Sequence, residues 1–172
     1  LTNHNVSDRI IEWNGYKRSS QRENCWHFNR KWRLGMDGFV LVLCGAALAA
    51  ALPGCGSSYG CGVAGQAGAG VITEDPEKFG RLLILQALPG TQGIYGLVGL
   101  FLVLNKLIGI DSSAITIGQG WQIIFACLPL AITGLVSAIY QGRCAAAGCS
   151  VVAKKPEEVG KAMIFAVVIE TY

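Results

Sequence analysis

Charged residues are scarce in this sequence, and three long stretches have none at all. Only 15% of the 172 residues are Asp, Glu, Lys or Arg, whereas 52% are hydrophobic. No charge interrupts residues 39–72, 82–105 or 112–141. A soluble helix would break such runs with a polar face, and about 20 apolar residues are enough to cross the hydrocarbon core of a bilayer. The distribution therefore favours a small membrane bundle over a soluble domain.

The residues needed for nucleotide or zinc chemistry are also missing. The sequence has no Gly-x-x-x-x-Gly-Lys-Ser/Thr loop, so any nucleotide chemistry must lie in partner proteins. It has no Cys-x-x-Cys pair, and its two histidines, His4 and His27, lie near the N-terminus. A structural zinc site is therefore not expected. Most cysteines lie among Gly and Ala, where small apolar filling is the expected role.

The net charge of +3 comes from the first 35 residues. Residues 1–35 contain seven Lys/Arg and three Asp/Glu, whereas residues 36–172 contain seven and eight. This segment shows no apolar period, so no nucleic-acid partner is predicted. It also lacks the apolar core of a signal peptide and ends just before Met36, a natural start. We expect residues 1–35 to be non-native leader sequence or disordered, the alternative being a genuine basic arm in the cytosol.

The remaining sequence repeats itself at an offset of 80 residues. Residues 75–81 align with residues 155–161, and Gly54 and Ser57 align with Gly134 and Ser137. Each repeat reads as a helical hairpin, in which a Gly-rich apolar helix, a short charged loop and a bulkier apolar helix follow one another. The repeats predict one hairpin over residues 36–111 and a second over residues 112–172.

The fold class predicted is therefore all-α, with four transmembrane helices in two duplicated hairpins. We expect the helices near residues 38–72, 79–107, 118–153 and from 159 onward. The fourth has about 14 residues, too few to cross a core of roughly 30 Å, so we expect it to be truncated in this chain. Basic residues gather in the first and third loops, which predicts a multi-pass protein of the cell membrane with the loops near Pro76 and Pro156 in the cytoplasm.

Small residues recur every fourth position in the first and third expected helices. They occupy positions 56, 60, 64 and 68 in one helix and 134, 138, 142 and 146 in the other. Such ridges allow helix backbones to approach closely. They are compatible with ordinary packing inside one chain, or with a ring of copies that has small residues inside and bulky residues facing the lipid bilayer.

Glu170 is the only carboxylate in the apolar run that ends the sequence. An ionisable side chain at bilayer depth costs a few kcal/mol or more, so it marks an ion or proton pathway by default. The matching position in the first repeat is Gly90. Only one of the two hairpins therefore carries the acid.

Other oxygen-bearing side chains are expected at the same depth as Glu170. They are Thr91, Gln92, Tyr95, Gln141 and Thr171. Pro89 removes a backbone donor and so frees carbonyl oxygens nearby. Together these groups would form a cage of hard oxygens, which suits a dehydrated alkali cation and favours Na⁺. Alternatively, the polar groups only hydrogen-bond a protonated Glu170, which would then carry H⁺.

Four motifs resemble the K subunit of bacterial V-type (V/A-type) ATPases. The motifs are Leu88-Pro-Gly-Thr-Gln-Gly-Ile-Tyr-Gly96, Tyr140-Gln-Gly-Arg-Cys-Ala-Ala-Ala-Gly148, Ala153-Lys-Lys-Pro-Glu157 and Ile169-Glu-Thr-Tyr172. The resemblance covers residues 36–172. It implies a four-helix proteolipid whose copies form the membrane rotor ring of an ATP-driven pump of the sodium-pumping type.

The resemblance also implies a set of ion-binding groups. In the sodium-pumping members these groups fall on the Leu88 backbone carbonyl, Thr91, Gln92, Gln141 and Glu170, with Tyr95 bonding the carboxylate. The expected partners are other copies of the chain, a stator membrane subunit and a central-stalk subunit, with ATP hydrolysis on soluble subunits. Two rival functions remain from the residues alone, a structural pore lined by Glu170 and a small proton-coupled exporter.

Overall fold

The protein is an all-helical bundle with the helix order that the two repeats predict. The computed structural model describes the backbone of residues 6–171 and the side chains of residues 38–171. The main helices are α1 (Val6–Ile72), α2 (Phe79–Ala87), α3 (Thr91–Leu107), α4 (Ile117–Lys154) and α5 (Val159–Ile169). Short 3₁₀ turns lie between them: η1 (Pro76–Lys78), η2 (Leu88–Gly90), η3 (Ser112–Ala114) and η4 (Pro156–Glu158).

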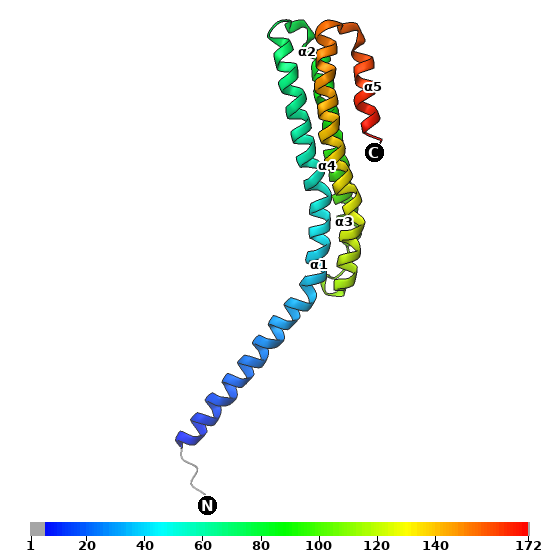
Figure 1. Cartoon of the computed structure of the whole chain (residues 1–172). Coiled ribbons are helices and arrows are strands. Elements are labelled where there is room, and N and C mark those ends of the chain that lie inside the picture. The colour runs from blue at the N-terminus through cyan, green and yellow to red at the C-terminus, as the bar shows by residue number, and fades with distance from the viewer. Residues whose placement is uncertain (1–5, 172) are drawn as a thin grey trace, which may run out of the picture.

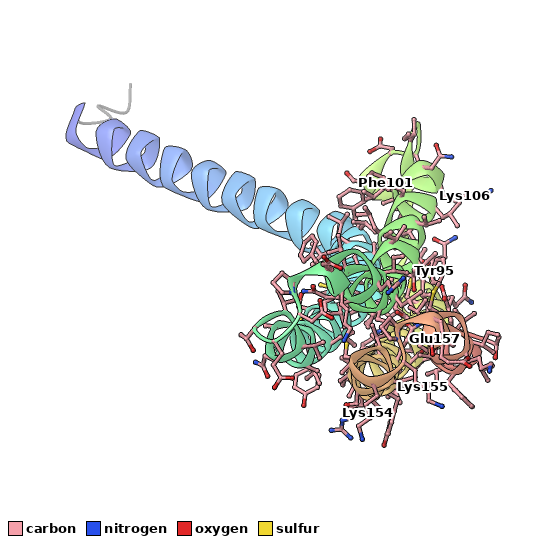
Figure 2. The ribbon with its side chains drawn as sticks, turned by 90° about the horizontal axis from the view of Figure 1, so that it is seen from above. Tyr95, Phe101, Lys106, Lys154, Lys155 and Glu157 are labelled. Atoms are coloured by element: carbon pink, nitrogen blue, oxygen red, sulfur yellow. The ribbon has the colours of Figure 1, made fainter. Side chains whose placement is uncertain are left out.

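The helices form two hairpins whose turns lie at the same end of the bundle. In Figure 1, the chain turns from α1 into α2 and from α4 into α5 at one end, and passes from α3 to α4 at the other. Figure 2 looks onto the turn end, where Lys154, Lys155 and Glu157 mark the turn between α4 and α5. The two Pro-containing loops therefore lie on one side of the bundle.

Three helical segments within the described residues are long and apolar enough to cross a membrane. They are Gly38–Ile72, Pro76–Leu107 and Ile117–Lys154, with mean hydropathies of 2.1, 1.5 and 2.2 over their best windows. Large apolar side chains such as Phe101 and Phe165 are exposed, which suits lipid contact. Helix α5 has 11 residues and is the short fourth helix that the sequence predicts. The prediction of an all-α membrane protein is confirmed.

Helix α1 begins earlier than the sequence predicts. Its apolar span starts at Gly38 as expected, but the helical backbone continues toward the N-terminus as far as Val6. Figure 1 shows this part of α1 projecting away from the bundle. Residues 1–5 lie outside the described residues, and the assignment of residues 1–35 as leader sequence stays a prediction.

Helices α1 and α4 form the central pair of the bundle, and their small residues face each other. A Cβ atom on Gly142 would collide with the Gly60 backbone, and one on Gly134 would lie 2.8 Å from Pro53 Cγ. A Cβ on Gly56 would lie 2.7 Å from the Leu135 carbonyl oxygen. The small residues at these positions therefore pack against each other within one chain. For these contacts the structure agrees with ordinary packing inside one chain, the first of the two explanations offered for the small residues.

One lysine joins the two loops at the turn end. Lys78 Nζ donates a 2.8 Å hydrogen bond to the Ala153 carbonyl near the C-terminus of α4. The same ammonium group lies 3.0 Å from Asp75 Oδ2. A positive charge at the C-terminal end of a helix is favourable because the last carbonyls there carry partial negative charge. Lys78 thus holds the first loop against the second hairpin.

Candidate functional site

The polar site begins at a break in the second membrane span. Helix α2 ends at Ala87 because Pro89 cannot supply the next backbone donor, and the 3₁₀ turn η2 connects it to α3. The Leu88 carbonyl accepts the backbone N–H of Thr91 and, at 2.9 Å, its hydroxyl group. The break therefore places a backbone oxygen and a side-chain oxygen at the same point.

Two glutamines from different hairpins form the buried centre of the site. Gln92 Nε2 on α3 donates a 2.6 Å hydrogen bond to Gln141 Oε1 on α4. Gln92 is 3% exposed and Gln141 is fully buried. The Thr91 hydroxyl lies 3.3 Å from Gln92 Oε1 and extends the contacts to the helix break. Because buried amides need partners, this pairing fixes α3 against α4 at the level of the site.

Glu170 lies at the C-terminal end of α5 and faces α3 and α4. Tyr95 OH donates a 2.6 Å hydrogen bond to Glu170 Oε1, and Gln141 Nε2 lies 3.5 Å from Glu170 Oε2. The carboxyl group is half-buried. Within residues 38–171, the ion pairs are Asp75–Lys78 and Glu158–Lys161, so no basic side chain neutralises Glu170. A half-buried carboxylate at the end of an apolar helix, without a cationic side chain, calls for a proton or a cation.

All six residues predicted for the ion site lie in one continuous network of hydrogen bonds. The network runs from the Leu88 carbonyl through Thr91, Gln92 and Gln141 to Glu170 and ends at Tyr95. Their roles in ion binding stay a prediction. Thr171 is not in the network, because its hydroxyl donates to the Val168 carbonyl in the last turn of α5.

The network supplies the ligands that an alkali cation prefers. It contains carboxylate, amide, hydroxyl and backbone carbonyl oxygens, all of them hard donors. No buried side-chain nitrogen or oxygen among the described residues lacks a hydrogen-bond partner. In this arrangement the oxygens accept hydrogen bonds from the amide and hydroxyl groups of the same network.

Sequence reasoning did not assign two serines near the site, of which Ser137 contacts it and Ser57 lies beside it. Ser137 Oγ donates to the Ile169 carbonyl at 3.0 Å and accepts from Gln92 Nε2 at 3.2 Å. Ser57 Oγ accepts the backbone N–H of Gly93 at 2.8 Å. One signal in the sequence could have identified them. The two serines align at the 80-residue offset, so the same polar residue recurs inside two apolar helices.

Comparison with known proteins agrees with this arrangement. A model of the family of ATP synthase C subunits matches residues 44–103 and 124–172. The chain is 49% identical over 135 residues to the V-type sodium ATPase subunit K of Enterococcus hirae. These aligned residues make up 78% of this chain and 84% of that protein. It is 41% identical over 136 residues to the A-type ATP synthase subunit K of Methanocaldococcus jannaschii, and these residues make up 79% of this chain and 58% of that protein.

The family match covers both hairpins, including the two halves of the polar network. Its first segment contains Leu88, Thr91, Gln92 and Tyr95, and its second contains Gln141 and Glu170. With nearly half of the aligned residues identical to one subunit K, the likeness extends well beyond a shared hydrophobic pattern. This chain belongs to the family of ATP synthase C subunits.

Proposed function

We propose that this chain is the ion-carrying proteolipid of the membrane rotor ring of a V/A-type ATPase, and that it carries Na⁺ at Glu170. The observation that supports this most is a carboxylate at the end of an apolar helix with no basic partner among the described residues, facing a connected set of neutral polar groups. The Enterococcus hirae relative is a V-type sodium ATPase subunit, which favours Na⁺ over H⁺ as the cargo.

The proposed mechanism depends on the charge of Glu170. In the empty site the carboxylate is negative and is costly to expose to hydrocarbon. A bound Na⁺ neutralises it, while Gln92, Thr91, Gln141 and the Leu88 carbonyl replace the water that the ion loses. The loaded copy of the chain can then turn through lipid, and a stator group of positive charge would release the ion. Moving one monovalent ion against 100 mV costs roughly 2.3 kcal/mol.

The partners follow from the same proposal. Copies of the chain form the ring, and a stator membrane subunit supplies the entry and exit paths. The loops at Pro76 and Pro156 lie in the cytoplasm and contact a central-stalk subunit, which transmits rotation from subunits that hydrolyse ATP. The chain itself is a transport component and not the catalyst.

Carbodiimide labelling of the assembled ring tests the cargo. The reagent modifies a protonated carboxyl group, so Na⁺ bound at Glu170 slows labelling of that residue at constant pH. Protection that follows pH alone, with no effect of Na⁺, would instead identify a proton carrier.

Transport measurements test the role of Glu170 itself. In vesicles reconstituted with the whole ATPase, Glu170→Gln is expected to abolish ATP-driven ²²Na⁺ uptake, because a neutral amide has no charge for the ion to balance. Asp111→Asn, at the opposite end of the bundle from the loops proposed to contact the central stalk, is the control and keeps uptake, because an Asn side chain can still accept the backbone N–H of Ser113. Uptake that survives Glu170→Gln would refute the proposal.

A further inference from the structure

Ser137 lies in α4, one helical turn before Gln141, and contacts two parts of the ion site. Its side chain is almost fully buried, with 8% of the residue exposed. The hydroxyl oxygen accepts a hydrogen bond from Gln92 Nε2, and the hydroxyl proton is donated to the Ile169 carbonyl. Ser137 thus joins α3 and α5, the two helices that carry Gln92 and Glu170.

We propose that Ser137 is a positioning residue that sets the affinity of the ion site. This inference rests on the proposed function, because it concerns the Na⁺ site at Glu170. Ser137 does not supply an ion ligand. It acts through two residues, by orienting the Gln92 amide and by holding the backbone next to Glu170.

The orientation of Gln92 follows from the single proton of a serine hydroxyl. Because Ser137 uses that proton on the Ile169 carbonyl, it can offer Gln92 only an acceptor. The group of Gln92 that faces Ser137 must therefore be the NH₂ group, whose other hydrogen bond goes to Gln141 Oε1. The remaining group, Gln92 Oε1, is left on the side of Thr91, where a cation ligand is needed.

The second contact fixes the end of α5. Ile169 immediately precedes Glu170, so the bond from Ser137 to its carbonyl attaches the last turn of α5 to α4. The Glu170 side chain itself forms hydrogen bonds with Tyr95 on α3 and Gln141 on α4. Without Ser137, the distance between the carboxylate and the glutamine oxygens would be less well defined, and the ion would bind a less preorganised site.

The first repeat shows why the two aligned serines are not equivalent. Ser57 has the position of Ser137, but it accepts its hydrogen bond from the Gly93 backbone, whereas Ser137 accepts one from a side-chain amide. The residues that match Ile169 and Glu170 in this repeat are Pro89 and Gly90, so no acid is held there. A Cβ on Gly90 would instead lie 3.7 Å from Cys61 Sγ. Only the second serine serves a carboxylate.

The test is Na⁺ protection of Glu170 from carbodiimide in assembled rings within the native ATPase, measured at constant pH by mass spectrometry. Ser137→Ala is expected to raise the Na⁺ concentration for half-protection about tenfold, the effect of losing a buried hydrogen bond. Ser58→Ala is the matched control, because the Ser58 hydroxyl bonds only the Gly54 carbonyl of its own helix. It should leave half-protection unchanged.

A second variant covers the case in which Ser137→Ala does not assemble. Ser137→Cys keeps the size of the side chain but weakens both hydrogen bonds, so it is expected to raise the half-protection concentration by about threefold or more. A value equal to that of the natural chain, in assembled rings of either variant, would overturn the role of Ser137. If Na⁺ does not protect the natural chain at all, the proposed sodium function fails first and this inference fails with it.

Discussion

Tyr95 and Glu170 lie 75 residues apart in the sequence, yet the tyrosine hydroxyl donates a 2.6 Å hydrogen bond to the glutamate carboxylate. Tyr95 is 49% exposed, so this contact lies on the outer side of the bundle and not between α1 and α4. The two hairpins are thus joined at the one acid of the network.

Tyr95→Phe tests whether this bond stabilises the site. The change removes one hydrogen bond to a carboxylate but keeps the ring, and such a bond contributes about 1.5–3 kcal/mol when well shielded. Because Tyr95 is half exposed, we expect an effect below this range, about 1 kcal/mol, which is a rise of about fivefold in the Na⁺ concentration that half-protects Glu170 from carbodiimide.

The control for this prediction is Tyr140→Phe. Tyr140 is also exposed, but its ring contacts the Arg143 guanidinium, 5.5 Å from the ring centroid, and makes no hydrogen bond to the site among those of the described residues. Equal half-protection in the natural chain and in Tyr95→Phe would show that the tyrosine bond does not contribute to ion affinity.

The sequence predicts the fold well because its main signals are local. Uncharged runs define the membrane spans, and the 80-residue repeat defines the two hairpins. Pro89 predicts the break that the structure shows at Leu88–Gly90. The six residues of the expected ion site also lie together. They could be named from the sequence because its motifs resemble those of the family.

Other features could not be predicted because they depend on how the helices pack. Ser137 is one more small residue on an apolar helix until α5 lies beside it and the Ile169 carbonyl comes within reach. Thr171 is expected near the site because it is next to Glu170, but it lies beyond the end of α5 and its hydroxyl bonds the Val168 carbonyl. The extension of α1 to Val6 has no counterpart in the apolar pattern.

The Gln92–Gln141 pair predicts strong coupling between two substitutions. Replacing either glutamine by alanine removes the shortest hydrogen bond of the other, buried amide, whereas replacing both removes the donor and the acceptor together. We expect the double variant to be less destabilised than the sum of the single variants by about 1–2 kcal/mol. The measurement is the free energy of thermal or denaturant-induced ring dissociation in detergent, and strictly additive effects would contradict a direct bond.

The contact between Gly60 and Gly142 predicts a strict size limit in the central helix pair. A Cβ on Gly142 would meet the Gly60 backbone, which cannot move aside as a flexible side chain can. Gly142→Ala should therefore destabilise the chain by about 1–3 kcal/mol and lower the yield of assembled ring. Gly62→Ala is the matched control, because apart from the backbone of its own helix turn no atom of the described residues lies within 4 Å of a Cβ there. Similar thermal midpoints for the two variants would mean that α1 and α4 do not pack at Gly142.

The Asp75–Lys78 pair predicts a dependence of stability on pH at the turn end. The hydrogen bond from the Lys78 ammonium group holds the pKa of Asp75 below its ordinary value of 3.8. Because the folded-state pKa is depressed, the stabilisation is complete above the unfolded-state pKa and is lost as the pH falls from there through the folded-state pKa. Asp75→Asn should therefore have a lower thermal midpoint than the natural chain at about pH 7, and the difference should shrink below about pH 4.

Glu77→Gln is the control for the Asp75 prediction, since Glu77 forms no ion pair within residues 38–171. A difference between Asp75→Asn and the natural chain that is constant from about pH 7 to about pH 3 would show that the ion pair does not stabilise the turn.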